Sequence, residues 1–323
     1  VVFNVNNALG LGVVSTTTPA LKTSTSLFVR LNNFNIGSYN AGKSNKSSIL
    51  YTIPRFASGT NESVGALFFE IIKIKIYLYN IMNNLPNISI LTPTYNRRKF
   101  LPLFLHNLKN QTYPHDKLEV CIDDDGTEPF IKDNEIETIK KHIYPIILKY
   151  VKRKDKRTIG EKRNNLVKKI ATNKILCFID DDDIYNCMYI QYSYQMLKEH
   201  KVNLVGSNSM LFTYPEKDYI MTRINCSEIY QIHEATMLFT RKYFNQMGGF
   251  NKSSRGEGAK FVLGQNYKNV FNSDISKVMI CVGHSGNSVD KEMFSVEKLR
   301  LECKFGGIEK QILNDILELN NNN

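Results

Sequence analysis

The sequence predicts an α/β fold with a mostly parallel central sheet and helices on both of its faces. From Asn87 onward, short apolar runs typical of buried strands alternate with longer stretches of helical periodicity. Strands that alternate with helices need crossover connections, and these produce a parallel sheet covered on both faces. The 323 residues are enough for one large α/β core or two modest domains.

The first part of this alternation is regular. We expect strands at Ile88–Leu91, Leu118–Ile122, Ile146–Val151 and Lys174–Ile179, separated by helices that end near Leu108, His142 and Ile170. Polar loops follow three of these strands, at Thr92–Asn96, Asp123–Thr127 and Asp180–Asp183. Because ligands of such sheets bind at the carboxyl ends of the strands, the three loops are expected to converge on one rim.

The later part has strand patterns at Asn203–Phe212, Tyr219–Ile224 and Ala235–Thr240, with a spacing closer to that of antiparallel hairpins. A short helix is predicted at Arg241–Met247, ended by Gly248 and Gly249. A strand at Val278–Val282 leads to His284, and Ser295–Leu319 has helical periodicity.

The four consecutive aspartates Asp180–Asp183 are the strongest functional signal. They start where an apolar strand stops, so several like charges are aimed into one crevice and repel one another. A solvated acidic turn would need no buried strand to aim it. The pattern therefore favours a divalent cation such as Mn²⁺ or Mg²⁺, which prefers carboxylate oxygens.

Residues 1–81 differ in texture from the rest. They are rich in Ser, Thr, Asn and Gly and contain short β-type runs at 26–31, 48–53 and 66–69. We interpret them as an N-terminal extension, either β-rich or poorly ordered. Residues 82–323, which start at Met82, are predicted to form the catalytic domain.

The net charge of +11 and the pI near 9.2 indicate an anionic partner. Nucleic acid is not favoured, because the basic stretch Lys149–Arg157 lacks interleaved aromatic residues apart from Tyr150. That stretch is instead typical of a solvated face or of a rim that steers phosphates. Six scattered cysteines without a paired motif indicate reduced thiols and a cytoplasmic protein. No transmembrane segment is predicted.

Five motifs in order resemble those of the family 2 glycosyltransferases, which have the GT-A fold. The resemblance covers residues 86–323 and is carried by Ile88–Arg97, Asp124–Thr127, Gly160–Asn164, Phe178–Asp183 and Gly248–Phe250. The Lys-Arg-Asn of the third motif and the His284–Asn287 segment are most similar to the branch found in large DNA viruses. For a viral protein, the host cytoplasm or the virion would be the location.

The resemblance implies a hexosyltransferase-type enzyme that uses a nucleotide-sugar donor, with UDP as the expected nucleotide, and a glycan, protein or lipid acceptor. Residue by residue, it implies a nucleoside pocket lined by Thr92, Pro93, Thr94 and Tyr95. It also implies a base contact from Asp124 or Asp125, nucleotide contacts from Lys162 and Arg163, and metal ligation by Asp180 and Asp182, with Asp181 as a ligand if the register slips by one. His284 is a candidate metal ligand or diphosphate donor.

The general base departs from the family pattern. Inverting members carry Glu-Asp after the glycine loop, and the second position here is Gly258. Glu257 is the first candidate for the base that deprotonates the acceptor hydroxyl, and Asp274 and Glu234 are alternatives. His233 and Asp181 are assigned to the donor and acceptor side, although core packing is an equal alternative for His233.

Two other function classes remain open from the sequence. A metal-dependent nucleotidyltransferase or nuclease would use Asp180–Asp183 with Asp123–Asp125 as a two-metal site, but it would need a nucleic-acid groove or a triphosphate loop. A decayed transferase or viral structural protein is favoured only by the missing aspartate at Gly258.

Overall fold

The computed structural model describes residues 84–228, 231–265, 268–287, 290–303 and 305–318, together with four short backbone segments near the N-terminus. The chain divides into two compact units, Val1–Asn84 and Leu85–Asn323.

The N-terminal segments form two antiparallel strand pairs. They are β1 (Asn4–Val5) with β2 (Leu11–Gly12), and β3 (Leu27–Val29) with β4 (Ile49–Tyr51). The pair β3 and β4 falls within two of the predicted β-type runs. The third run at 66–69 and Met82 lie outside the described residues.

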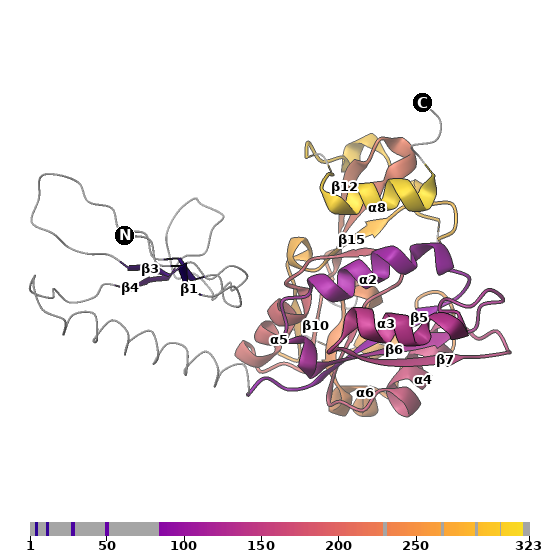
Figure 1. The fold of residues 1–323 in the computed structure, drawn as a ribbon, viewed down its shortest axis with the longest axis horizontal. Helices are drawn as coiled ribbons and strands as arrows, with labels where there is room; N and C mark the ends of the chain where they lie inside the picture. Colours follow the sequence, from indigo (N-terminus) through magenta and orange to yellow (C-terminus); the bar gives the residue numbers. More distant parts are fainter. Residues whose placement is uncertain are drawn as a thin grey trace, which may run out of the picture. The chain divides into compact units, whose positions relative to one another are not determined.

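The second unit is built around a seven-stranded sheet in the order β14-β10-β13-β8-β5-β6-β7 (Figure 1). Only β13 runs antiparallel to its neighbours. The strands are β5 (Ile88–Thr94), β6 (Leu118–Asp124), β7 (Ile147–Lys152), β8 (Ile175–Phe178), β10 (Leu204–Gly206), β13 (Leu238–Thr240) and β14 (Val270–Asn272). The predicted α/β fold with a mostly parallel sheet is confirmed.

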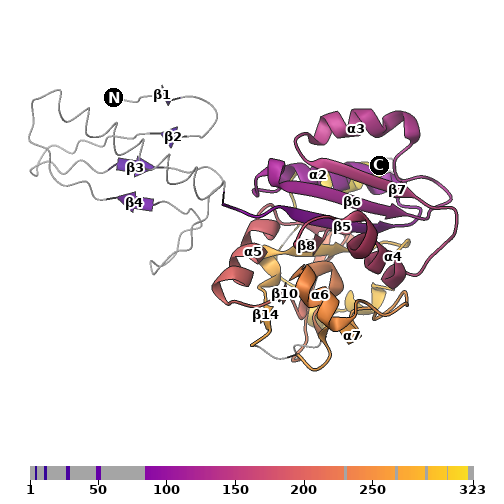
Figure 2. The same ribbon diagram turned by 90° about the horizontal axis from the view of Figure 1, so that it is seen from below.

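Helices cover both faces of this sheet (Figure 2). One face is covered by α2 (Leu101–Asn110), α3 (Ile136–Ile143) and α5 (Tyr189–Glu199), and the other by α4 (Ile159–Asn165), η4 (Leu166–Ile170), α6 (Arg241–Met247) and α7 (Ala259–Val262). Alternate residues of one strand enter different cores. Ile90 packs with the first group and Leu91 with the second, and both are fully buried.

A second sheet of four strands stands beside the first, in the order β12-β11-β15-β9. Its strands are β9 (Ile184–Tyr185), β11 (Ser209–Tyr214), β12 (Ile220–Asn225) and β15 (Met279–Val282). Helix α8 (Ile308–Leu317) packs over this sheet and α2 through a third apolar cluster that includes Phe100, Tyr219 and Leu313 (Figure 1).

Short 3-10 turns connect these elements. They are η1 (Arg98–Phe100), η2 (His115–Lys117), η3 (Asp133–Glu135), η5 (Pro215–Lys217), η7 (Glu234–Thr236), η8 (Ile275–Lys277), η9 (Glu292–Phe294) and η10 (Glu297–Leu299). In the described part of the chain, no helix combines the length and the hydropathy needed to cross a bilayer.

Two predicted elements are divided in the structure. The predicted strand 203–212 is two strands in different sheets, because at Ser207 and Asn208 the backbone N–H groups donate to the side chains of Thr236 and Asn272 (2.8 and 3.1 Å) and leave the strand ladder. The predicted helical stretch 295–319 is helical over η10 and α8, and Gly307, with a φ of +96°, precedes α8.

Candidate functional site

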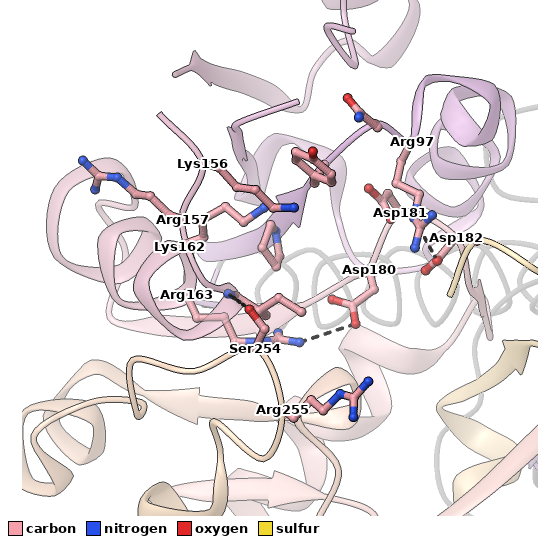
Figure 3. A pocket seen from close by; sticks show the side chains of 15 residues that line it. Arg97, Lys156, Arg157, Lys162, Arg163, Asp180, Asp181, Asp182, Ser254 and Arg255 are labelled. Atoms are coloured by element: carbon pink, nitrogen blue, oxygen red, sulfur yellow. Dashed lines mark hydrogen bonds and ion pairs between the residues drawn. The ribbon is translucent and has the colours of Figure 1, made fainter. Parts of the chain in front are cut away.

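The aspartate run lies at the carboxyl end of β8, beside the ends of β5 and β6, as predicted. It borders a pocket of about 460 Å³. Figure 3 shows Asp180, Asp181 and Asp182 on one side of this pocket and Lys156, Arg157 and Lys162 on the other. The lining residues are Pro93, Tyr95, Asn96, Arg97, Lys156, Arg157, Ile159, Lys162, Arg163, Asp180, Asp181, Asp182, Ser254, Arg255 and Gly286.

Helix α4 presents the two inner cations, and its position is fixed at both ends. Thr158 caps the helix: its hydroxyl accepts from the Glu161 N–H, and the Glu161 carboxylate accepts from the Thr158 N–H (3.2 and 3.1 Å). The Asn164 amide exchanges two hydrogen bonds with the backbone of Phe250 (2.8 and 2.9 Å). These bonds bring the motif at 160–164 against the glycine turn at 248–250.

Lys162 and Arg163 are both buried at this wall. The Lys162 ammonium donates to the Asp125 carboxylate (2.6 Å) and to the Thr94 carbonyl (2.8 Å). Arg163 pairs with Glu257 through Nε (3.0 Å), and its Nη2 lies 3.5 Å from Asp180 (Figure 3). Its Nη1 is buried without a hydrogen-bond partner, so this donor is unsatisfied within the protein.

The pKa values of the three aspartates are shifted in different directions because their neighbours differ. Burial raises the pKa of Asp180, although Arg163 opposes the shift. Burial and the charge of Asp182 raise the pKa of Asp181 well above its ordinary value. Burial also acts on Asp182, but a hydrogen bond from His284 and the charge of Arg97 outweigh it, so the pKa of Asp182 is lowered.

Two side chains from distant segments hold Asp182. Arg97 Nε lies 3.2 Å from Asp182 Oδ2, and His284 Nε2 lies 3.2 Å from the same oxygen. The Gly286 N–H donates to His284 Nδ1 (3.1 Å), so the proton of the neutral ring is on Nε2 and is donated to Asp182. The structure thus brings the predicted residues Asp182 and His284 together.

The site fits a metal that is shared with substrate. Among the described residues, no three His, Cys, Asp or Glu side chains are arranged to hold a metal ion by themselves. Asp180 Oδ1 is nevertheless buried without a hydrogen-bond partner, which is costly unless a cation or a donor arrives. Mg²⁺ commonly binds one or two carboxylates together with substrate phosphates, and this donor set matches that arrangement.

The acids at the end of β6 have internal partners. Asp124 accepts from Gly126 N–H (2.8 Å), Phe130 N–H (2.7 Å) and the Tyr150 hydroxyl (2.6 Å), and it is fully buried. Asp125 accepts from the backbone of Arg157 (2.6 Å) as well as from Lys162. Asp123 binds the side chains of Arg153 and Asn165. Neither Asp124 nor Asp125 lines the pocket, so a base contact from either one stays a prediction.

Only some of the residues predicted to line the nucleoside pocket do line the observed pocket. Pro93 and Tyr95 line the pocket, whereas Thr92 is fully buried and donates to the Ile179 carbonyl (2.7 Å). Thr94 is buried as well, and its side chain lies against Asp181, where burial raises the pKa and a hydrogen bond from Thr94 lowers it. Thr92 therefore ties the end of β5 to the segment that leads into the aspartates.

Several pocket residues were not assigned from the sequence. The ammonium of Lys156 lies 4.1 Å from the centre of the Tyr95 ring, and Arg157 and Arg255 complete the cationic side. Lys156 and Arg157 belong to the basic stretch, so its interpretation as a rim that steers phosphates was the useful signal. Arg97 stood within the first motif without an assigned role.

Neither the candidate base Glu257 nor His233 lines the pocket. Glu257 is buried against Arg163, and burial is the main cause that raises its pKa. Burial lowers the pKa of His233 to about 4, with a smaller contribution from Lys291. Asp274, one of the alternatives for the base, is exposed and accepts from the backbone of Ser276 in η8 (3.0 Å).

The sequence profile of Glycosyl transferase family 2 matches residues 89–257. Glycosyltransferase AglE of Haloferax volcanii is 26% identical over 135 residues, which are 41% of this chain and 42% of that protein. Poly(ribitol-phosphate) beta-N-acetylglucosaminyltransferase TarS of Staphylococcus aureus is 26% identical over 112 residues, which are 35% of this chain and 19% of that protein. The matches thus span less than half of each relative.

Solved structures give weaker similarities. S. aureus TarS 1-349 aligns with a TM-score of 0.47 and 18% identity over 61% of this chain and 60% of that one. The mannosyltransferase PcManGT from Pyrobaculum calidifontis, in complex with GDP-Man and Mn²⁺, aligns with a TM-score of 0.45 and 18% identity over 72% and 68%. Because both TM-scores are below 0.5, the family assignment rests on the sequence profile.

Proposed function

Because this chain belongs to glycosyl transferase family 2, we propose that it transfers a sugar from a nucleotide-diphosphate donor, with UDP as the nucleotide, to a hydroxyl acceptor with inversion. The observation that carries this proposal is the two-sided pocket. Asp180, which keeps a partner-free oxygen, lies on one side of the pocket, and the cations of Lys156, Arg157 and Lys162 line the other (Figure 3). Such a pocket suits a diphosphate, whose charge must be neutralised when its bond to the sugar breaks.

The nucleoside half of the donor is assigned to the end of β5. Tyr95 offers an aromatic face, Pro93 an apolar edge, and Lys156 lies over the same ring. Two further TarS structures are complexes with UDP and UDP-GlcNAc, and we choose UDP as the first nucleotide to test.

The diphosphate half is assigned to the cations around the aspartates. The ion pair with Asp125 holds the Lys162 ammonium group in place, whereas Arg163 Nη1 has no hydrogen-bond partner. Asp180 and Asp182 are the residues that would hold Mn²⁺ or Mg²⁺, and His284, whose two ring nitrogens are engaged by Asp182 and the Gly286 N–H, would orient Asp182 rather than ligate the ion. The ion would supply a Lewis acid that stabilises negative charge on the leaving diphosphate.

The acceptor hydroxyl must lose its proton as its oxygen attacks the sugar. The acidic pair Glu257 and Glu234 is assigned to this role, since both lie beside Arg163 and next to the loop that carries Arg255. The acceptor itself, whether glycan, protein or lipid, is left to a screen.

Residues 82–323 are proposed as the transferase domain and 1–81 as an extension. A cytoplasmic location stays a prediction. The relatives named above come from an archaeon and a bacterium, so membership of the viral branch also stays a prediction. The two-metal alternative loses support because Asp123, Asp124 and Asp125 all have internal partners.

Calorimetric titration with UDP, with and without Mn²⁺, tests the proposal on the intact chain and on two variants. We expect metal-dependent binding by the wild type and by Asp155→Ala, which removes an exposed carboxylate near the rim. Asp182→Ala is expected to bind at least about tenfold more weakly, because losing a ligand costs no less than losing an outer-shell partner. Absence of binding in every sample would favour a decayed transferase, and binding that ignores Mn²⁺ would refute the metal assignment.

A further inference from the structure

The space next to Gly258 is filled by the side chain of Glu234. A Cβ at position 258 would lie 2.5 Å from Glu234 Cγ and 2.6 Å from Glu234 Oε1. The Gly258 N–H donates to Glu234 Oε1 (2.7 Å). Glycine at 258 is therefore the condition for Glu234 to occupy this place, and the backbone of the loop holds one oxygen of the carboxylate.

The segment that carries Glu234 is fixed to the aspartate run. The Asp180 N–H donates to the Tyr185 hydroxyl (2.9 Å), which donates to the carbonyl of Ala235 (3.1 Å). The Phe178 N–H donates to the carbonyl of Met237 (3.1 Å). The residue after Glu234 is thus two hydrogen bonds away from Asp180, and η7 is anchored to the end of β8.

The carboxylates of Glu257 and Glu234 differ in their exposure and in their contacts. Glu257 is 5% exposed, and its Oε1 accepts from Arg163 Nε (3.0 Å). Glu234 is only half-buried, and its Oε2 makes no hydrogen bond or ion pair with the described part of the chain. A base must present a free oxygen to the hydroxyl that it deprotonates. Each acid uses its Oε1 in these contacts, but Glu234 is the more exposed of the two, so its second oxygen is the more accessible to an acceptor, whereas Glu257 is buried and orients Arg163.

We propose that Glu234 is the general base of the transfer reaction and that Gly258 makes room for it. This inference rests on the proposed function. Glu234 Oε2 takes the proton of the acceptor hydroxyl while the hydroxyl oxygen forms its bond to the anomeric carbon. The bond from that carbon to the diphosphate oxygen breaks, and its electron pair leaves with the nucleoside diphosphate. The protonated Glu234 then returns its proton to solvent.

The test uses the full chain and the nucleotide sugar that binds best by calorimetry, with water as the acceptor and release of the nucleoside diphosphate as the readout. Glu234→Gln keeps the size of the side chain and an oxygen for the Gly258 N–H. We expect kcat to fall by about 10²–10⁴-fold, as for loss of a general base, with donor affinity unchanged. Glu228→Gln, an exposed carboxamide substitution in the same connection, is the matched control and should keep the wild-type rate.

A relocation experiment separates a base from a structural residue. Gly258→Asp alone should lose activity because its Cβ collides with Glu234. The double variant Glu234→Gly with Gly258→Asp places a carboxylate in the vacated space. Its rate should be at least tenfold higher than that of Glu234→Gly alone. Recovery of this kind supports a base, since restored packing alone would not need a carboxylate.

The outcomes separate this inference from the function on which it rests. A folded Glu234→Gln variant with kcat within twofold of wild type overturns the assignment of Glu234, while turnover by the wild type keeps the transferase. A larger loss in Glu257→Gln than in Glu234→Gln, at equal donor affinity, would move the base to Glu257. A wild type that neither binds nor cleaves any nucleotide sugar overturns both.

Discussion

Replacing Asp124 by asparagine tests whether this acid is a structural anchor or a contact for the nucleobase. The carboxylate accepts from Gly126 N–H, Phe130 N–H and the Tyr150 hydroxyl. Asparagine has one oxygen and one NH₂ group. In its better orientation, the oxygen accepts from the Phe130 N–H and the Tyr150 hydroxyl, and the NH₂ group faces the Gly126 N–H, so two donors oppose each other.

The cost follows from these contacts. A hydrogen bond to a charged group is worth about 1.5–3 kcal/mol, and the two remaining bonds weaken when the acceptor becomes neutral, so we expect a loss of about 3 kcal/mol. For a domain of this size, that loss corresponds to a fall in Tm of about 6–12 °C. Urea and thermal unfolding of the intact chain measure it.

Two comparisons decide the interpretation. Tyr150→Phe removes a single donor to Asp124 and should cost about 1.5 kcal/mol, the lower end of the range for a hydrogen bond to a charged group. UDP affinity of folded Asp124→Asn, measured well below its Tm, should equal that of the wild type. A variant as stable as the wild type that binds UDP tenfold more weakly would refute the structural role and restore the predicted base contact.

Two further predictions concern stability. Gly160→Ala places a Cβ 1.7 Å from the Asn251 carbonyl oxygen and should lower the free energy of unfolding in urea by about 3 kcal/mol. Gly256→Ala, at a φ of +61° with open space around it, should lower it by about 1 kcal/mol, and equal losses would contradict the packing argument. Burial and the charge of Lys291 hold the pKa of His233 at about 4 in the folded chain against about 6.5 unfolded, so stability is lost as the pH falls from 6.5 to 4, by up to about 3 kcal/mol. His233→Asn should lose less over that range, and a parallel pH dependence in urea unfolding would refute the assignment.

The sequence predicted the layers of the fold well because the signal is local. Along β5, Ile90 enters one core and Leu91 the other, so both faces of the strand are apolar and the run is continuous. Local signals also fixed α6, whose bounds match the predicted Arg241–Met247 and whose end has Gly248 at a φ of +73°. The division near Ser207 was missed, because it depends on side-chain acceptors that lie far along the chain.

Membership of the pocket was only partly predictable. Tyr95, Lys162 and Asp180 line it as expected. The contact of Arg97 with Asp182, and that of Lys156 with Tyr95, depend on how loops meet after folding. Spacing in the sequence carries no information about such contacts, and the excess of positive charge indicated only an anionic partner.

The strongest contrast is between two aspartates in equivalent places, each at the end of a buried strand. Asp124 has a protein donor for both of its oxygens, whereas Asp180 keeps a buried oxygen with none. A motif fixes where a carboxylate stands, but the donors that satisfy it come from other segments, so the sequence cannot say which acid is left free for a ligand. Distant segments likewise separate Glu257, which is buried against Arg163, from the half-buried Glu234, whose position depends on the absence of a side chain at Gly258.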